Sequence, residues 1–402
     1  MTKNDDLAAW LVRAGLQNTA IDVLIAGFGE RLVELDFPVS RLVLGIFILH
    51  PIYEAFGYRW TAGGKVEIEP ARAEDLKTAR FQESPFFDLV KNNERFRRLR
   101  PADDESSDIL HDLAEAGVTD YCLFREPFET RREIPIWNRP EERVTFNEGI
   151  MGSMATRHDA GFTDEQVERL RWYFSLLCLA MRVNANFSLA RAILDTYLGE
   201  RSGARVLSGQ IKRGGGQIIR AAIAITDLRG STKMSERLEL DTYLETINHY
   251  YDCTAGTVIE HGGEVLKFMG DGMLAIFPFE DTEPPSIACG RVIEAARAML
   301  ARIDELNRSK AGSEKLAIGI GLHVGEIAYG NVGTKQRLDF TAIGRTVNEV
   351  AKLENLCKTV GKPLLATAEF REMANTSKLV PVKVDTRDER TVFTLRALRS
   401  GD

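Results

Sequence analysis

The sequence predicts an α/β protein of the mixed α+β kind, built as two domains joined by a connecting helix. Three observations support this prediction. The chain has 402 residues, which is too long for one ordinary domain. Its hydrophobic content of 44% and charged content of 28% are typical of a globular protein with full apolar cores. Strand-like apolar runs alternate with helix-like apolar spacings along the chain.

The composition also excludes several classes of partner and compartment. The net charge of −7 argues against a nucleic acid partner, because phosphate backbones select basic surfaces. No membrane span is expected, since the longest apolar run, 42–49, is short enough to be a buried strand. The polar N-terminus lacks the apolar core of a signal peptide. The five cysteines are scattered and odd in number, as expected for reduced, mostly buried thiols in a cytoplasmic protein.

Residues 1–162 predict a small α/β sensor-like domain. Apolar residues at helical spacing occupy 6–35, and strand-like runs follow. The predicted strands cover 41–49, 53–60, 120–124 and 150–156. This order of elements resembles sensor domains of the GAF or PAS kind, and the resemblance implies an unknown small-molecule or protein effector.

Residues 163–218 predict a long signalling helix followed by a glycine-rich transducer linker. Thr163 is the expected N-cap, with Gln166 completing a capping box. Further along, apolar residues recur at alternating spacings of three and four, at Tyr173, Leu176, Ala180, Val183, Phe187, Ala190, Leu194 and Tyr197. This pattern fits either a parallel two-chain coiled coil or one amphipathic helix packed on its own domain. Gly199 is expected to end the helix, and 199–217 to act as a hinge.

Residues 219–402 predict a second mixed domain, in which two aspartates stand where apolar strands end. The predicted elements are strand 220–226, helix 240–261, hairpin 264–277, helix 286–307, strand 316–324, helix 345–360 and a short strand near 363. Asp227 follows the first strand, and Asp271 occupies the Gly-Asp-Gly tip of the hairpin. Ser231 and Thr232 can cap the helix after Asp227. Each Asp alone is an ordinary turn residue, but the pair can hold divalent ions and a polyphosphate.

Four motifs in this region resemble the class III nucleotidyl cyclase catalytic domain. They are Asp-Leu-Arg-Gly-Ser-Thr, Lys-Phe-Met-Gly-Asp-Gly, His-Val-Gly-Glu with Gly-Asn-Val-Gly, and Asp-Phe-Thr-Ala-Ile-Gly followed by Val-Asn. Their order and spacing make the set specific, and the resemblance covers about 219–398. It implies a ferredoxin-like βαβ-type fold and the conversion of ATP to 3′,5′-cyclic AMP and pyrophosphate.

The resemblance further implies a two-metal reaction with two Mg²⁺ or Mn²⁺ ions per active site. Asp227 and Asp271 match the carboxylates that bridge the metals, with the backbone carbonyl of Leu228 as a further ligand. The backbone N–H groups expected to hold the triphosphate belong to Arg229, Gly230, Ser231 and Thr232. The Arg229 side chain itself is expected to be solvated or structural.

Purine choice is expected at Lys267 and Thr341. Family members that use ATP have Lys and Asp or Thr at these positions, whereas guanylate-forming members have Glu and Cys. Lysine only donates hydrogen bonds, which suits adenine N1, so ATP is favoured. Guanylate cyclase activity is the alternative.

Asn348 and Lys352 are the expected catalytic residues, four positions apart on one helix face. Asn348 matches the residue that orients the ribose, and Lys352 stands where the family has an Arg that contacts the α-phosphate. Lysine keeps the charge but loses the planar fork, so a catalytically weak, nucleotide-binding regulatory homologue is a second alternative. A further phosphate-binding cation is expected at Arg387 or Arg390.

The metal-binding and the purine-binding residues lie on different sides of the family fold. The resemblance therefore implies a homodimer through the catalytic domains and the signalling helix, with two identical sites. The sensor pair is expected to regulate activity by shifting one catalytic half against the other. A passive dimerisation role for the C-terminal domain is disfavoured, because both metal carboxylates are present.

Overall fold

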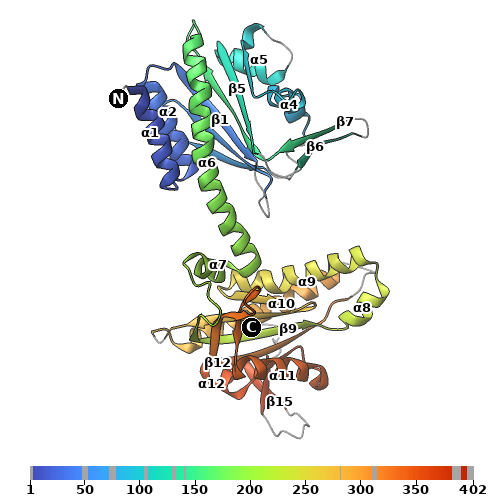
Figure 1. Cartoon of the computed structure of the whole chain (residues 1–402). Coiled ribbons are helices and arrows are strands. Elements are labelled where there is room, and N and C mark those ends of the chain that lie inside the picture. The colour runs from blue at the N-terminus through green and yellow to red at the C-terminus, as the bar shows by residue number, and fades with distance from the viewer. Residues whose placement is uncertain are drawn as a thin grey trace. The chain divides into compact units, whose positions relative to one another are not determined.

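The computed structural model describes residues 3–47, 53–71, 78–103, 107–128, 133–139, 142–280, 282–309, 315–382 and 391–395. The chain divides into two compact units, Met1–Ile193 and Leu194–Asp402 (Figure 1). Both units combine sheets and helices, so the predicted α+β class is confirmed. Within the described ranges, no helix is both long and apolar enough to cross a bilayer. The five cysteines are free thiols, and four of them are buried.

The N-terminal unit contains a six-stranded antiparallel sheet with the strand order β3-β2-β1-β8-β5-β4. A separate hairpin, β6–β7, extends from it. The strands are β1 (Val39–Phe47), β2 (Ala55–Thr61), β3 (Glu67–Ala71), β4 (Phe96–Leu99), β5 (Asp120–Pro127), β6 (Glu133–Arg139), β7 (Glu142–Asn147) and β8 (Gly149–Thr156). Alternate residues of the central strands face the two sides of this sheet, which explains why both faces carry an apolar core.

Helices cover both faces of this sheet. The helical elements are α1 (Lys3–Leu16), α2 (Ile21–Glu34), α3 (Ala79–Gln82), α4 (Pro85–Lys91), the 3₁₀ turn η2 (Pro101–Asp103), α5 (Asp108–Glu115) and α6 (Asp164–Leu198). The helices α1, α2 and α6 pack on one face, where Phe28, Trp60 and Tyr173 are buried together. The helices α4 and α5 pack on the other face. The N-terminal unit therefore combines helices and strands as predicted, while the assignment as a sensor domain of the GAF or PAS kind stays a prediction.

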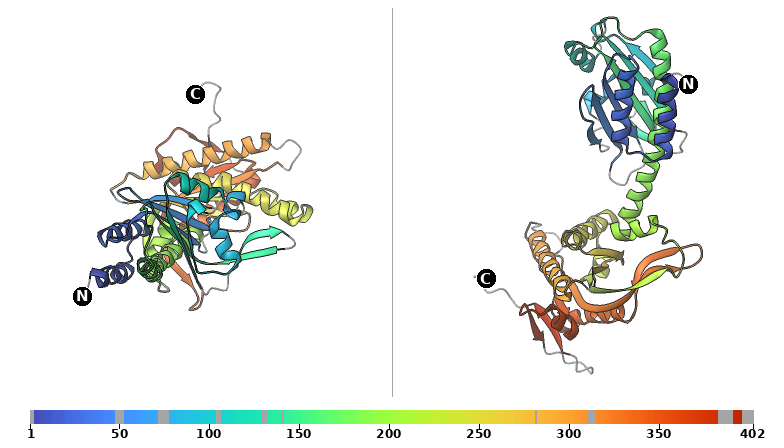
Figure 2. Two further views of the ribbon diagram at one scale, coloured as in Figure 1. Left: turned by 90° about the horizontal axis from the view of Figure 1, so that it is seen from above. Right: turned by 90° about the vertical axis from the view of Figure 1, so that its left-hand side faces the viewer.

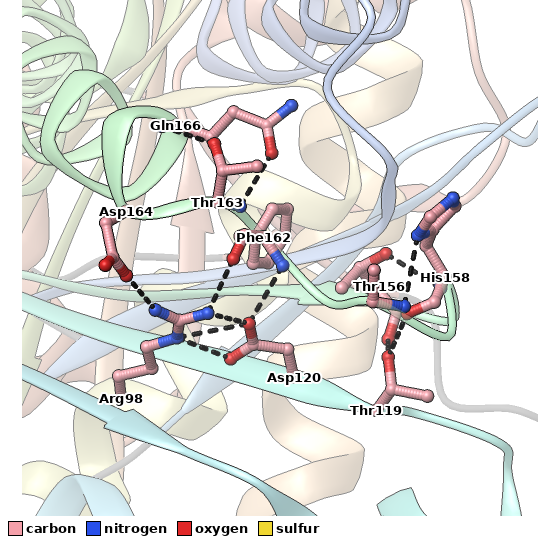
Figure 3. A network of polar contacts seen from close by, with 10 residues as sticks. Arg98, Thr119, Asp120, Thr156, His158, Phe162, Thr163, Asp164 and Gln166 are labelled. Carbon is pink, nitrogen blue, oxygen red and sulfur yellow. Dashed lines mark hydrogen bonds and ion pairs between the residues drawn. The ribbon is translucent and has the colours of Figure 1, made fainter.

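The predicted capping box starts helix α6 (Figure 3). The N–H of Gln166 donates to Thr163 Oγ1 at 3.2 Å, and the N–H of Thr163 donates to Gln166 Oε1 at 2.9 Å. The segment before the helix is held by Arg98, which pairs with the buried Asp120 at 2.7 Å and donates to the Phe162 carbonyl at 2.6 Å. This start was predictable because a capping box is a local signal.

The apolar pattern along α6 divides into two parts. Tyr173 and Ala180 are buried in the N-terminal core, which matches the interpretation of a helix packed on its own domain. Val183, Phe187 and Tyr197 are exposed, at 44%, 51% and 79%. The predicted coiled-coil contact with a second chain therefore remains a prediction only for the part of α6 from Val183 onward.

The predicted connector at 199–217 contains a helix, and its role as a hinge between the two units stays a prediction. Helix α6 does end immediately before Gly199, which has a φ of 86°. Helix α7 (Glu200–Leu207) follows at once, and it belongs to the C-terminal unit, where Ser202 is fully buried. The glycines indicated flexibility, but the contacts that order this helix come from strands far away in the sequence.

The C-terminal unit is built on an eight-stranded sheet with the order β10-β11-β9-β12-β14-β16-β15, and β13 pairs with β12. The strands are β9 (Gly216–Leu228), β10 (Glu264–Phe268), β11 (Gly272–Phe279), β12 (Ile318–Gly333), β13 (Leu338–Ile343), β14 (Leu364–Ala366), β15 (Leu379–Val382) and β16 (Val392–Leu395). The path β9-α9-β10-β11-α10-β12 with the strand order β10-β11-β9-β12 is the predicted ferredoxin-like arrangement.

The helices of this unit are α8 (Ser231–Arg237), α9 (Leu240–Glu260), α10 (Pro285–Ser309), α11 (Arg345–Val360) and α12 (Ala368–Ala374). The helices α9 and α10 lie side by side over one face of the sheet (Figures 1 and 2). The helices α7 and α11 contribute to the core on the other face. The strands β9 and β12 are longer than predicted, because they pair with each other through glycine-rich and polar segments of low strand propensity.

Candidate active site

Asp227 and Asp271 lie at neighbouring strand ends, as the motifs predicted. Asp227 pairs with Gly272, the residue that follows Asp271 in the hairpin. The N–H of Leu228 donates to the Asp271 carbonyl at 2.9 Å. Burial and the charge of Asp271 both raise the pKa of Asp227. The sheet therefore holds two carboxylates close enough to repel each other.

Two side-chain contacts that the sequence did not reveal hold the hairpin tip. The Ser231 hydroxyl donates to the Asp271 carboxylate. The Tyr251 hydroxyl donates to the carbonyls of Gly270 and Gly272 at 2.8 and 3.2 Å. Burial and the charge of Asp271 raise the pKa of Tyr251 to about 12, so this hydroxyl keeps its proton. A tyrosine inside helix α9 carries no motif that would have identified this role.

The donor set fits a hard divalent cation. Asp227, Asp271 and the Leu228 carbonyl offer oxygen ligands, which Mg²⁺ and Mn²⁺ prefer. A cation between the carboxylates would also offset the repulsion that contributes to the raised pKa of Asp227. In the part of the chain that the structure describes, no three His, Cys, Asp or Glu side chains gather into a metal site. Any ion here would complete its shell with water or phosphate oxygens.

The Arg229 side chain has a structural role. Its Nη2 lies 3.2 Å from Glu354 Oε1, with the two side chains 20% and 6% exposed. Gly319 leaves the space for this pair, since a Cβ there would lie 2.0 Å from Arg229 Nη2 and 2.4 Å from Glu354 Oε1. The pair joins the chain just after the end of β9, two residues after Asp227, to α11.

The backbone at Arg229 differs from the expected phosphate cradle. Its N–H donates to the Ala317 carbonyl at 2.8 Å, so this donor is already used. Gly230 has a φ of 78° and turns the chain into helix α8. The amides of Gly230, Ser231 and Thr232 remain as the predicted cradle.

Replacing Arg229 with alanine should lower the free energy of unfolding by about 3 kcal/mol, because it leaves the Glu354 carboxylate buried without its partner. Arg302→Ala is a matched control, since it breaks an exposed pair with Glu260 and should cost at most about 1 kcal/mol. Chemical denaturation of the two variants measures the difference. If both variants lose the same free energy of unfolding, Arg229 and Glu354 do not form a buried structural pair.

Lys267 forms an ion pair with Asp339 across β10 and β13. Thr341 lies two residues after Asp339, on the same face of β13, and is only 9% exposed. The fold thus brings the two predicted purine residues to one region and adds a carboxylate beside them. No role for Asp339 was predicted from the sequence, although strand alternation places this residue on the same face as Thr341.

Asn348 and Lys352 are exposed on the outer face of helix α11. The Lys352 side chain is 67% exposed, and its Nζ lies 3.1 Å from Glu349 Oε1. Since an α-helix turns roughly 100° per residue, Lys352 lies about 160° around α11 from Glu354. Glu354 faces Arg229, so Lys352 lies on the side of α11 opposite to the face packed near the two aspartates.

Two cavities in this unit involve the predicted substrate residues. One of about 850 Å³ is lined by Lys352 together with Arg345 and His323. The other, of about 650 Å³, is lined by Lys267 and Asp339. Within the described residues, neither cavity is lined by Asp227 or Asp271. The predicted cations Arg387 and Arg390 lie outside the described residues.

Comparisons with known proteins give the family of this region. Residues 217–385 match the model of the adenylate and guanylate cyclase catalytic domain. An adenylate cyclase of Anabaena cylindrica is 32% identical over 163 residues, which are 39% of this chain and 31% of that protein. The terminal-differentiation-specific adenylate cyclase of Dictyostelium discoideum is 30% identical over 155 residues, 39% of this chain and 7% of that protein. The crystal structure of adenylyl cyclase CyaB from P. aeruginosa is 23% identical, covering 46% of this chain and 97% of that chain with a TM-score of 0.41.

This chain spans about a third or less of the length of these two curated relatives. The matched segment begins in β9 and contains Asp227 and Asp271. It also contains Lys267, Thr341 and Asn348. Residues 217–385 of this chain are a class III catalytic domain of the adenylate and guanylate cyclase family.

Proposed function

We propose that this protein is an adenylate cyclase, which converts ATP to 3′,5′-cyclic AMP and pyrophosphate. The family of residues 217–385 supports the cyclase chemistry, and Lys267 with Thr341 supports the choice of ATP. The Lys267 ammonium donates hydrogen bonds and accepts none, so it suits the unprotonated N1 of adenine better than the N1–H of guanine. Its ion pair with Asp339 limits where the ammonium can lie.

In the proposed reaction, the ribose 3′-hydroxyl attacks the α-phosphorus of the same nucleotide. A bond from O3′ to phosphorus forms, the bond to the bridging oxygen of the β-phosphate breaks, and pyrophosphate leaves with the electron pair while the hydroxyl proton passes to solvent. Asp227, Asp271 and the Leu228 carbonyl would hold two Mg²⁺ or Mn²⁺ ions, which lower the pKa of the 3′-hydroxyl and offset charge on the leaving group. Asn348 would orient the ribose, and Lys352 would face the α-phosphate.

The orientation of helix α11 carries the proposal that the site is shared between two chains. Its Glu354 face packs toward the two aspartates, whereas Asn348 and Lys352 lie on its outer face. One chain therefore does not direct both sets of residues at a single triphosphate. A two-fold homodimer through the catalytic domains would place the outer face of one α11 opposite the aspartates of the partner and create two equal sites.

Regulation by the N-terminal unit is part of the same proposal. The exposed apolar residues Val183 and Phe187 on α6 offer a second contact for the dimer. An effector bound by the N-terminal unit, either a small molecule or a protein, would act by shifting the two catalytic halves. A displacement of about 1 Å costs on the order of a hundredfold in rate when reacting groups must be aligned.

A catalytically weak homologue is the second candidate function, and the Lys352–Glu349 contact favours it. The ammonium lies 3.1 Å from the Glu349 carboxylate, which would compete with the α-phosphate for the same cation. A lysine also lacks the bidentate fork of the family arginine. The two candidate functions differ in how fast the natural protein forms cyclic AMP, which is slow or absent for the weak homologue.

The purified full-length chain should form cyclic AMP from ATP with Mg²⁺ or Mn²⁺, with a kcat/KM for ATP at least about tenfold above that for GTP. Chromatographic detection of the cyclic products measures both reactions. Preference for GTP would overturn the choice of purine. If the natural protein forms almost no cyclic AMP and the Lys352→Arg variant forms it about a hundredfold faster, the protein is the weak homologue instead. Absence of cyclic product from both proteins would reject the cyclase proposal.

A further inference from the structure

A buried polar network in the C-terminal unit has no part in the reaction proposed above. Glu264 Oε1 accepts hydrogen bonds from the Ser202 N–H at 3.0 Å and from the Ser202 hydroxyl at 2.5 Å. The Tyr329 hydroxyl lies 3.0 Å from each of the two Glu264 carboxylate oxygens, and 3.0 Å from the Ser202 hydroxyl. Ser202, Glu264 and Tyr329 are 0%, 5% and 2% exposed. We name these three residues the Glu264 network.

A buried carboxylate is costly unless donors surround it, so the Glu264 network constrains the elements that supply the donors. Burial raises the pKa of Tyr329, which keeps its hydroxyl protonated as a donor. The guanidinium of Arg205 lies 4.8 Å from the centre of the Tyr329 ring and adds a cation beside the network. The three residues come from α7, β10 and β12, which are far apart in the sequence.

Of the two strands that meet in the Glu264 network, β10 carries Lys267 and β12 pairs with β13, which carries Thr341. Glu264 is the first residue of β10, and Lys267 follows three positions later on this edge strand. The pairing of β10 with β11 shifts register just before Lys267, so the ladder alone holds it weakly. Tyr329 of β12 pairs with Ala342 of β13, which is the residue after Thr341.

We propose that Glu264 is a positioning residue for purine recognition, which acts by tying α7 to β10, the strand of Lys267, and to β12, the strand that pairs with β13 and thereby holds Thr341. Helix α7 supplies Ser202 as the common donor, and Tyr329 links the carboxylate to β12. The Lys267–Asp339 contact joins β10 and β13 on the other side of the same region. Loss of the network would let β10 move relative to β13. The inference rests on the proposed function, because it assigns the role of the network through the ATP site.

Tyr329→Phe removes the donor that links Glu264 to β12 and keeps the ring. The probe is 3′-deoxy-ATP, which lacks the attacking hydroxyl and cannot be cyclised. Its Kd should rise about tenfold in the full-length variant. This is less than the hundredfold loss of rate that a misplacement of about 1 Å can cause. The ratio of the Kd values for 3′-deoxy-GTP and 3′-deoxy-ATP should fall. In the cyclase assay, KM for ATP should rise while kcat stays within about twofold of the natural protein. Glu264→Gln keeps the shape of the side chain, so it should raise the Kd for 3′-deoxy-ATP less than Tyr329→Phe does.

Thr394→Val is the matched control, because it removes one buried hydroxyl that donates to the Leu364 carbonyl at 2.8 Å, at the β14–β16 pairing. Its Kd for 3′-deoxy-ATP should equal that of the natural protein. If thermal unfolding shows that Tyr329→Phe does not fold, Ser202→Ala takes its place with the same expectations. Unchanged Kd values and an unchanged purine ratio in the folded variant would overturn the inference. Because binding is measured without turnover, failure of the cyclase reaction in the natural protein would count against the proposed function only. The Kd values of the variants could still be compared.

Discussion

Replacing Asp227 with asparagine should lower cyclic AMP formation by on the order of a thousandfold, because the site loses a charged metal ligand. Asparagine is nearly isosteric, so the backbone pairing with Gly272 should persist. Removing the charge also relieves the repulsion with Asp271, so thermal stability should not fall. Product formation and thermal unfolding of the same sample separate the two effects. Activity above about a tenth of the natural rate would exclude Asp227 as a metal ligand.

Mixing this variant with Asn348→Ala tests whether the site is shared between chains. In a mixed dimer, one site combines both defects and the other combines the intact Asp227 with the intact Asn348. After equal mixing and exchange, half of the dimers are mixed, so about a quarter of the natural activity should return. A mixture of Asp227→Asn with Asp271→Asn is the control and should stay inactive, since every site then lacks one carboxylate. No recovery in the first mixture, despite proven exchange, would place the whole site within one chain.

Replacing Lys267 with Glu and Thr341 with Cys should change the ratio of kcat/KM for ATP and GTP by about a hundredfold in favour of GTP. The glutamate would accept from the N1–H and amino group of guanine, which lysine cannot do. The structure adds a condition, because the new carboxylate would face Asp339, the present partner of Lys267. Adding Asp339→Asn removes this like-charge contact and should increase the preference for GTP further.

A lysine elsewhere on the domain provides the control for this change. Lys378 is half exposed and pairs with Glu294, as Lys267 pairs with Asp339. Lys378→Glu should leave the ratio for ATP and GTP unchanged. Steady-state kinetics with both nucleotides measures all of these variants. The assignment of Lys267 and Thr341 would be wrong if the double and triple variants kept the natural ratio.

Local patterns were enough to predict many elements of this fold. The helix predicted at 345–360 has these bounds in the structure, and Thr163 caps α6 as expected. Such features depend on residues within one or two turns of each other, so the sequence contains their full cause. Helix α7 within 199–217 was not predicted, because the burial of Ser202 depends on Glu264, a residue distant in the chain.

The sequence by itself determined the family of residues 217–385 and the two aspartates at strand ends, and it predicted the choice of ATP from Lys267 and Thr341. These follow from motifs in which the chemistry needs particular residue types at fixed spacing. Only the tertiary structure decided the partners of those residues: Arg229 with Glu354, Lys267 with Asp339, and α7 with the Glu264 network. Each of these contacts joins segments far apart in the chain, and strand register and helix orientation set which side chains meet. The physical reason is that spacing along the chain defines what a residue can do, whereas packing defines what it faces.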